Sequence, residues 1–323
     1  MDDAVSAMLQ DDEALELADA LGHSNVASQT LDMLQASVVR VAQTYSTVAP
    51  PSLLQWAQTR MAAVIAMLRG SQPIAQRRRL CILAAEIAGL RAWLAHDLQQ
   101  TVSASALYAA ATTAAEEAED SALFAWVLGN HSRIPIYEDQ PRTALCLIEE
   151  ALDRADGHAS AITRAWLWAQ ASRARTALHD PAAGASALVE AERALDQASA
   201  DTSDEILYFD HGRLNAFVGH HYVLAGQPHH AERHIRASLA VLQPQQVKHL
   251  SLTRLDLAGV LLAEDELVEA CDQAVTALDI PPDQVIDSTV RRAAGLRRQL
   301  RPHVRQLPAV GEVIDLIDHL PRA

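Results

Sequence analysis

Glycine, proline and aromatic residues are all scarce in this chain of 323 residues, which contains 12 glycines, 13 prolines and 13 aromatic residues. No clear run of β-branched residues alternating with polar residues is present, so we expect no β-sheet. Half of the residues are hydrophobic, and alanine and leucine dominate them. Because alanine costs no side-chain entropy in a helix and lets two helices approach closely, this composition favours an all-α fold.

Lysine and cysteine are also rare. Lys248 is the only lysine, which leaves almost no candidate for a lysine Schiff base or a phosphate-loop lysine. The cysteines Cys81, Cys146 and Cys271 are widely separated and odd in number, as in a reduced cytosolic protein with buried thiols. The chain shows no positively charged, apolar leader and no uncharged stretch long enough to cross a membrane. We therefore expect a cytoplasmic protein without a membrane partner.

Negative charge dominates, with a formal net charge of −15. This surplus repels phosphate backbones and anionic membranes at long range. A group of arginines near the C-terminus runs against it, and we interpret the group as a solvated helix face rather than a nucleic-acid patch. Its members are Arg291, Arg292, Arg297, Arg298, Arg301 and Arg305.

Small residues recur at a spacing typical of a tetratricopeptide-like helical hairpin, in which they mark where two helices cross. The position that opens the second helix of each hairpin falls at Ala104, Ala144, Gly184, Ala231 and Ala270. The residue seven further on is small each time: Ala111, Ala151, Ala191, Ser238 and Ala277. The intervals of 40, 40, 47 and 39 residues exceed the ~34 of the regular motif, so we expect longer helices.

These signals predict three regions. Residues 1–72 form an N-terminal helical segment that packs on the array, 73–280 form five tetratricopeptide-like helix pairs, and 281–323 form C-terminal capping helices. The pairs are expected at 74–97 with 101–118, 121–137 with 141–156, 159–178 with 181–199, 210–225 with 228–242, and 249–263 with 266–279. An acidic helix up to residue 22, with Ser24 capping the next one, and a spacer at 201–209 complete the prediction. The fold class is an all-α solenoid, a right-handed superhelix of about fourteen helices.

Four degenerate motifs carry a resemblance to a known family. They are Leu80-x-x-Leu83-Ala84-Ala85-x-x-Ala88-Gly89-x-x-x-Trp93-Leu94-Ala95-x-Asp97, Ala122-Leu123-x-Ala125-Trp126-Val127-Leu128-Gly129, Ala144-Leu145-x-Leu147-x-x-x-Ala151 and Ala187-Leu188-x-x-Ala191-Glu192-x-Ala194-Leu195-Asp196. From about Val39 to Ser199, and more loosely to Asp279, the chain resembles the tetratricopeptide-like sensor regions of actinobacterial helix-turn-helix (XRE-type) regulators. The resemblance implies a regulatory, ligand-sensing role.

The start of the chain departs from this family. The family pattern has a DNA-binding unit of about seventy residues before the equivalent of Asp32, whereas only about thirty residues, acidic in balance, precede it here, without a basic recognition helix. Either the chain is a regulator without its DNA-binding head, or the scaffold serves another purpose. We expect no direct binding of nucleic acid.

The repeat register predicts which side chains line the concave face, because fixed positions of each first helix point inward. Aromatic walls with a few convergent polar groups are typical of a small-molecule or peptide groove, although the tryptophans could instead fill gaps between helices. Arg133 and Arg173 lie one repeat apart and could together hold a carboxylate or phosphate. The predicted ligand-binding residues are Trp93, Trp126, Asn130, Arg133, Tyr137, Trp166, Gln170, Arg173, Arg213, Phe217, His220 and Asp256.

Signatures of metal binding and catalysis are weak. Seven histidines fall between His211 and His249, and His230 and His234 share a helical face, but no third ligand is evident. Neither a glycine-rich phosphate loop, nor HExxH, nor a Gly-x-Ser-x-Gly elbow is present. We predict no metal, no cofactor and no catalytic residue.

Two function hypotheses follow. The first is a ligand- or partner-sensing regulatory binding module that meets a peptide, a small molecule or a partner protein in the groove. The alternative is an enzyme of specialised metabolism with its active site in the groove, using Arg133, His220 or Asp256 as acid or base. A homodimer is left open.

Overall fold

The computed structural model describes residues 26–198, 207 and 209–321, and every regular element in these ranges is helical. The expected acidic first helix, its end near Ser24 and most of the 201–209 spacer lie outside the described residues. The elements are α2 (Ser28–Thr44), α3 (Pro50–Leu68), α4 (Ile74–Asp97), α5 (Thr101–Glu117), α6 (Ser121–His131), α7 (Arg133–Tyr137), α8 (Pro141–Ala155), α9 (Ala161–Ala177), α10 (Pro181–Asp196), α11 (His211–Leu224), α12 (Pro228–Val241), α13 (Val247–Ala263), α14 (Leu267–Leu278), η1 (Pro282–Gln284), α15 (Asp287–Leu300), η2 (Arg301–His303) and α16 (Pro308–Asp318).

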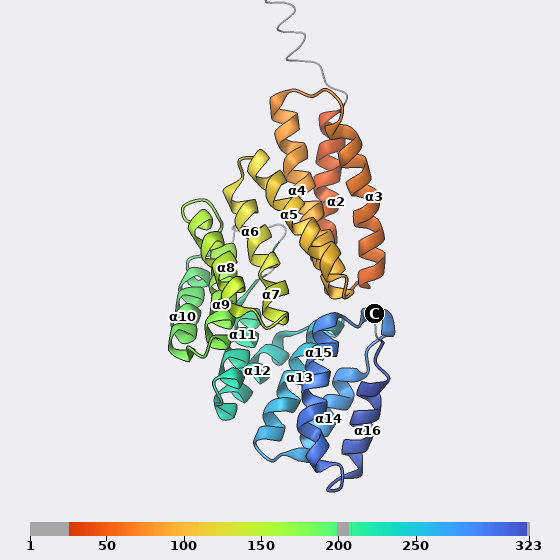
Figure 1. Ribbon diagram of the computed structural model, residues 1–323, viewed down its shortest axis with the longest axis vertical. Coiled ribbons are helices and arrows are strands. Elements are labelled where there is room, and N and C mark those ends of the chain that lie inside the picture. Colours follow the sequence, from red (N-terminus) through yellow and green to blue (C-terminus); the bar gives the residue numbers. More distant parts are fainter. Residues whose placement is uncertain (1–25, 199–206, 208, 322–323) are drawn as a thin grey trace, which may run out of the picture.

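Consecutive helices pair as antiparallel hairpins that stack along a curved path (Figure 1). The pairs α4 with α5, α6–α7 with α8, α9 with α10, α11 with α12, and α13 with α14 correspond to the five expected repeats. All ten small residues predicted at the helix crossings, from Ala104 to Ala277, are buried. The all-α, tetratricopeptide-like class is therefore confirmed, with about fourteen helices when the interrupted α6–α7 is counted once.

The helix expected at 121–137 is broken, which the sequence interpretation missed. α6 ends at His131 and α7 begins at Arg133. Pro135 explains the break, because it has no backbone N–H to donate to the carbonyl four residues earlier and its ring clashes with that carbonyl. At the break, the hydroxyl of Ser132 donates to the Gly129 carbonyl (2.7 Å). The break turns α7 and its arginine toward the centre of the molecule.

The turn within each hairpin is also repeated. Three residues connect the two helices of each of the five pairs, and the middle one is in the left-handed region with φ between 58° and 68°. The next N–H bonds back to the carbonyl five residues earlier, which is a Schellman motif. Four of the five turns use a residue other than glycine. The middle residues are Gln99, Asp139, His179, Gly226 and Asp265.

The segment after α2 contacts the C-terminal helices, so the solenoid closes on itself. In Figure 1, the C-terminal helices α13–α16 lie directly below α2–α4. The ammonium of Lys248 on α13 donates to the backbone carbonyls of Tyr45 and Val48 (2.7 Å to Val48), in the segment after α2. The Gln284 side chain donates to the Thr47 carbonyl (3.0 Å). We call this contact between residues 45–49 and α13–η1 the seam.

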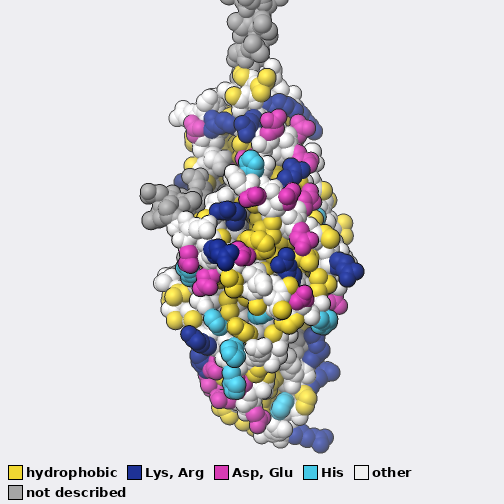
Figure 2. Space-filling view, turned by 90° about the vertical axis from the view of Figure 1, so that its left-hand side faces the viewer, with side chains coloured by type: hydrophobic (Ala, Val, Ile, Leu, Met, Phe, Trp, Pro, Cys, Tyr) yellow, Lys and Arg dark blue, Asp and Glu magenta, His cyan; other side chains and the backbone are white. Residues whose placement is uncertain are grey.

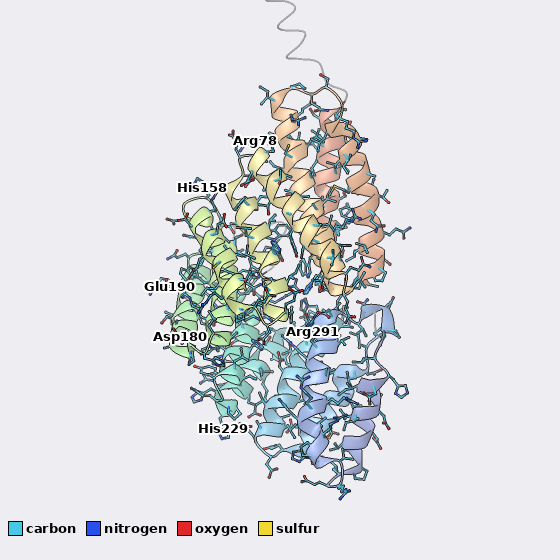
Figure 3. All side chains as sticks on the ribbon, in the orientation of Figure 1. Arg78, His158, Asp180, Glu190, His229 and Arg291 are labelled. Atoms are coloured by element: carbon cyan, nitrogen blue, oxygen red, sulfur yellow. The ribbon has the colours of Figure 1, made fainter. Side chains whose placement is uncertain are left out.

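α15 forms a second part of the closure. Figure 3 labels Arg291 at the junction between α15 and α7. Its guanidinium donates to the Tyr137 carbonyl (2.9 Å) and to Asp287 (2.6 Å). The hydroxyl of Ser288 donates to that of Tyr137 (2.8 Å). Part of the C-terminal arginine group therefore makes internal contacts, and the solvated face expected for all six was too simple.

Candidate functional site

The concave face encloses a cavity of about 360 Å³. The first helices of all five hairpins contribute side chains to it, and α2 and α15 close it where the two ends of the chain meet. This volume lies in the range of small-molecule sites, which are mostly apolar concavities with a few placed polar groups. The closure covers part of the cavity, where an open groove was expected.

Eleven of the twelve residues predicted for the groove border this cavity. The repeat register finds them because it assigns the inward face of each first helix. The eleven are Trp93, Asn130, Arg133, Tyr137, Trp166, Gln170, Arg173, Arg213, Phe217, His220 and Asp256. The structure shows that these residues border the cavity, and their role in binding a ligand stays a prediction.

Trp126 is the exception, and its expected place in the groove wall needs correction. Only 4% of its surface is exposed and it does not border the cavity. Its ring lies against the backbone of Gly89 on α4, so close that a Cβ there would come within 2.5 Å of a ring carbon. Trp126 therefore fills the gap between α4 and α6. Trp166 borders the cavity and also fills a gap between helices, because its ring packs on Gly129.

Several cavity residues were missed by the repeat register. His249, Leu252 and Thr253 lie seven, four and three residues before Asp256, on the same face of α13, so helical periodicity could have found them. Tyr45 and Phe209 lie outside the repeats, and no spacing in the sequence points to them.

Aromatic side chains form two walls of the cavity. The rings of Tyr45 and Trp93 are tilted by 36° with centroids 4.0 Å apart, and the Arg133 guanidinium lies 5.1 Å from the Trp93 centroid. Phe209 and Phe217 meet edge to face at 5.8 Å. Such walls present large apolar surfaces at little entropic cost.

Four arginines and one aspartate line the same cavity, although the whole chain is acidic. Arg292 pairs with Asp256 at 2.8 Å. Arg133 lies 3.6 Å from Asp97, a fully buried carboxylate behind the cavity wall that also accepts from the Tyr45 hydroxyl (2.5 Å). Burial raises the pKa of both Asp97 and Asp256, and the adjacent arginines offset this only in part.

The other two arginines contact aromatic or imidazole rings. Arg213 contacts the ring of His249 through Nη2 (3.3 Å). The guanidinium of Arg173 lies over the Tyr137 ring, 5.2 Å from the centroid, and its buried Nε has no hydrogen-bond acceptor among the described residues. The expected pair of equivalent arginines therefore has two different surroundings.

Positive charge also acts on the titratable groups of the cavity. Burial, and then the charges of Arg173 and Arg292, hold the pKa of His220 well below its ordinary value. Burial and the charge of Arg213 likewise hold the pKa of His249 well below its ordinary value. Burial disfavours the Tyr137 phenolate, but Arg173 and the other arginines outweigh it and lower its pKa to about 8. Both histidines are thus neutral at pH 7, so the net positive charge comes from the arginines.

The histidine-rich segment forms no metal centre in the described part of the chain. No group of three or more metal-ligating side chains comes together there. His221 Nδ1 lies 2.8 Å from the Thr176 hydroxyl, and His234 Nδ1 lies 2.9 Å from the Asn215 amide oxygen. His230 and His234 both lie against the ring of Tyr222. In Figure 2, most of the visible histidines lie at separate places on the lower half of the molecule.

Comparison with known proteins identifies the fold. No protein-family model matches the chain, and no curated protein matches it. Among solved structures, a Rap protein complexed with competence and sporulation factor is similar over 91% of this chain and 94% of its own, with a TM-score of 0.54 and 14% identity. BtubC (BKLC) from P. vanneervenii is similar over 71% of this chain and 90% of its own, with a TM-score of 0.50 and 15% identity. Both proteins are similar to this chain in their tetratricopeptide-like helical fold.

The described helices contain no segment with both the length and the apolarity that a membrane crossing requires. The fold and the cavity together define a protein of the tetratricopeptide-like helical fold with a central cavity.

Proposed function

We propose that this protein is a regulatory binding module that takes a peptide, a small molecule or a segment of a partner protein into its central cavity. The observation that carries the proposal is the central cavity of about 360 Å³, which side chains from all five hairpins line and which includes aromatic residues and four arginines. Because every hairpin contributes to one chamber, an occupant contacts the whole array at once. Binding can then alter the curvature of the solenoid or the closure of its seam.

The likeness to the Rap protein supports this reading, because that protein was solved in complex with a factor. The resemblance to the sensor regions of XRE-type regulators of actinobacteria supports it as well. We propose a cytoplasmic regulator that does not itself contact DNA, since the net charge is −15 and four of its arginines face the internal cavity. A DNA-binding partner would then read out the occupied state. Formation of a homodimer stays a prediction.

One observation favours an enzyme as the second candidate. Asp256, whose pKa is raised by burial, and neutral His220 border the same cavity and could exchange a proton with a bound substrate. Arg133 is less suited to this role than expected, because it is close to Asp97 and retains its proton. A product that appears only with active protein, and is lost in Asp256→Asn, would favour catalysis.

The decisive experiment is native mass spectrometry of the protein purified from its own host. We expect a co-purifying molecule that is released on unfolding. Ala216 on α11 borders the cavity, so Ala216→Trp should fill the chamber and abolish co-purification. Ala182→Trp, at an exposed position of α10, is the matched control and should retain the molecule. A protein that carries no occupant in any form, or one whose occupant persists in Ala216→Trp, would contradict the proposal.

A further inference from the structure

Arg173 differs from the other cavity arginines in its contacts. No carboxylate of the described residues lies within ion-pair distance of it, and its only specific contact there is with the face of the Tyr137 ring. Its Nε is buried without an acceptor. A buried donor without an acceptor costs free energy unless a water or a ligand binds it. The guanidinium therefore offers an unoccupied set of donors to the cavity.

No neighbour of Arg173 among the described residues forms an ion pair with it. Asp256 is the one acid among the lining residues, and Arg292 already pairs with it at 2.8 Å. His220 is held neutral and adds no competing charge. Gln170, one turn earlier on α9, borders the same space with its amide. The charge of Arg173 thus remains for an anion, with polar side chains beside it that can accept or donate further hydrogen bonds.

Most of the remaining lining is apolar. Trp166, Phe217, Leu252 and Ile286 border the cavity, from α9, α11, α13 and the residue before α15. Removing apolar ligand surface from water against such side chains is favourable. The cavity therefore places the Arg173 guanidinium beside large apolar surfaces.

From this arrangement we infer that the occupant carries one carboxylate at the end of an apolar body, and that Arg173 binds this carboxylate. The inference rests on the proposed function and names its ligand class. A single guanidinium matches the single charge and the planar, bidentate geometry of a carboxylate. The carboxylate can belong to a small aryl or acyl acid or to the free C-terminus of a peptide.

Matched acids and amides test this inference by isothermal titration calorimetry. The small-molecule arm compares 3-phenylpropionate with 3-phenylpropionamide and octanoate with octanamide. The peptide arm compares the peptide Ala-Leu-Ala-Leu-Phe with its C-terminal amide. We expect the acids of at least one arm to bind the wild type at least about tenfold more tightly than their amides, because charge-assisted hydrogen bonds form only with the acid. Binding by the first arm alone identifies a small acid, and by the second alone a peptide.

Variants of two arginines on α9 locate the effect. Arg173→Gln should abolish the preference for acids, and Arg173→Lys should restore part of it, since lysine keeps the charge but loses the bidentate geometry. Arg175→Gln is the control, because Arg175 lies 3.7 Å from Glu149 and does not border the cavity. Urea unfolding of each variant checks that the fold is retained.

The outcomes separate this inference from the proposed function. If amides bind as tightly as acids and Ala216→Trp blocks both, the cavity binds ligands but the carboxylate inference is wrong. If Arg173→Gln keeps the acid preference, the inference is wrong as well. If neither acids nor amides bind the wild type and no occupant co-purifies, both the inference and the proposed function fail.

Discussion

Arg133 and Arg173 occupy equivalent positions one repeat apart, and their surroundings show how single residues acquire different roles. Arg133 lies beside the buried Asp97 and over Trp93. Removing it would leave a buried carboxylate without its neighbouring cation, a change that is strongly destabilising in other proteins. Arg173 has no such carboxylate, so its removal leaves no buried charge behind. Arg133 is therefore part of the wall, whereas Arg173 is free to bind a ligand.

Replacement of Trp126 by alanine should cost about 3 kcal/mol of unfolding free energy, because it leaves a void between α4 and α6. Urea unfolding followed by circular dichroism measures the loss. Ligand binding should be retained under conditions in which the variant is folded, since Trp126 does not border the cavity. A loss below about 1 kcal/mol would show that the ring is not a core element.

Buried His96 predicts an acid dependence of stability. Burial, with the charges of Arg133, Arg291 and Arg173, lowers its pKa to about 3. The unfolded chain, in which a histidine has a pKa of ~6.5, then binds more protons between pH 6.5 and 3, so stability falls as pH falls through this window. His96→Gln should remove roughly 2 kcal/mol of the stability lost between pH 6.5 and 5. Denaturant titrations of both proteins at these two pH values give the difference, and equal losses would contradict the assignment.

At the scale of the helix, close crossings depend on residues without a side chain. Gly89 in α4 lies under the Trp126 ring and Gly219 in α11 lies against Ile235, with a built Cβ only 2.5 Å from either neighbour. The hairpin turns depend less on glycine, since four of the five place a residue other than glycine in the left-handed region. Packing and the Schellman hydrogen bonds hold these turns in place. Small residues are thus required at crossings more strictly than in turns.

Two glycines in the middle of helices provide a matched test of this requirement. Gly89→Ala should destabilise the protein by about 1–3 kcal/mol, because the added methyl group meets the Trp126 ring. Gly259→Ala in α13 should stabilise it by about 0.5–1 kcal/mol, because the nearest atom is the end of the flexible Gln299 side chain at 3.7 Å. Thermal unfolding of the two variants should shift in opposite directions. A shift of the same sign in both would show that the crossing at Gly89 relaxes without cost.

For the whole molecule, closure of the solenoid depends on one side chain in particular. Lys248 is completely buried, and burial lowers its pKa to about 8. Its ammonium donates to the carbonyls of Tyr45 and Val48, which lie 203 and 200 residues before it in the chain. The ammonium also lies 4.2 Å from the centroid of the Tyr45 ring. The seam therefore couples the first and last parts of the array around the cavity.

Lys248→Met should open the seam while preserving the volume of the side chain. Two buried carbonyls lose their donor, at an expected cost of about 1–3 kcal/mol. Hydrogen exchange of residues 45–49 should accelerate, and small-angle scattering should report a larger radius of gyration. Arg298→Met, on the exposed face of α15, is the control and should leave both unchanged. An unchanged exchange rate in Lys248→Met would show that other contacts hold the seam.

The sequence by itself determined the hairpins and the inward face of each first helix. Crossings between neighbouring helices are local, so the small residues at Ala104, Gly184 and Ala231 report them through their spacing alone. The same register predicted twelve inward-facing residues, and eleven of them border the cavity. It could not separate Trp126 from Trp166, because the two occupy equivalent positions of the repeat and differ only in what the neighbouring helix leaves exposed.

Only the tertiary structure decided that the array closes. The contacts of the seam and of α15 with α7 join residues about 150 to 240 positions apart, as for Ser288 with Tyr137 and Gln284 with Thr47. A repeat pattern carries no information on such contacts, because they depend on the accumulated curvature of all the hairpins. The ion pairs of Arg133 with Asp97 and of Arg292 with Asp256 join neighbouring helix pairs, but the spacing of small residues does not specify them, because it reports helix crossings and not the contacts of charged side chains. Those pairings, which only the tertiary structure shows, leave Arg173 without an ion pair among the described residues.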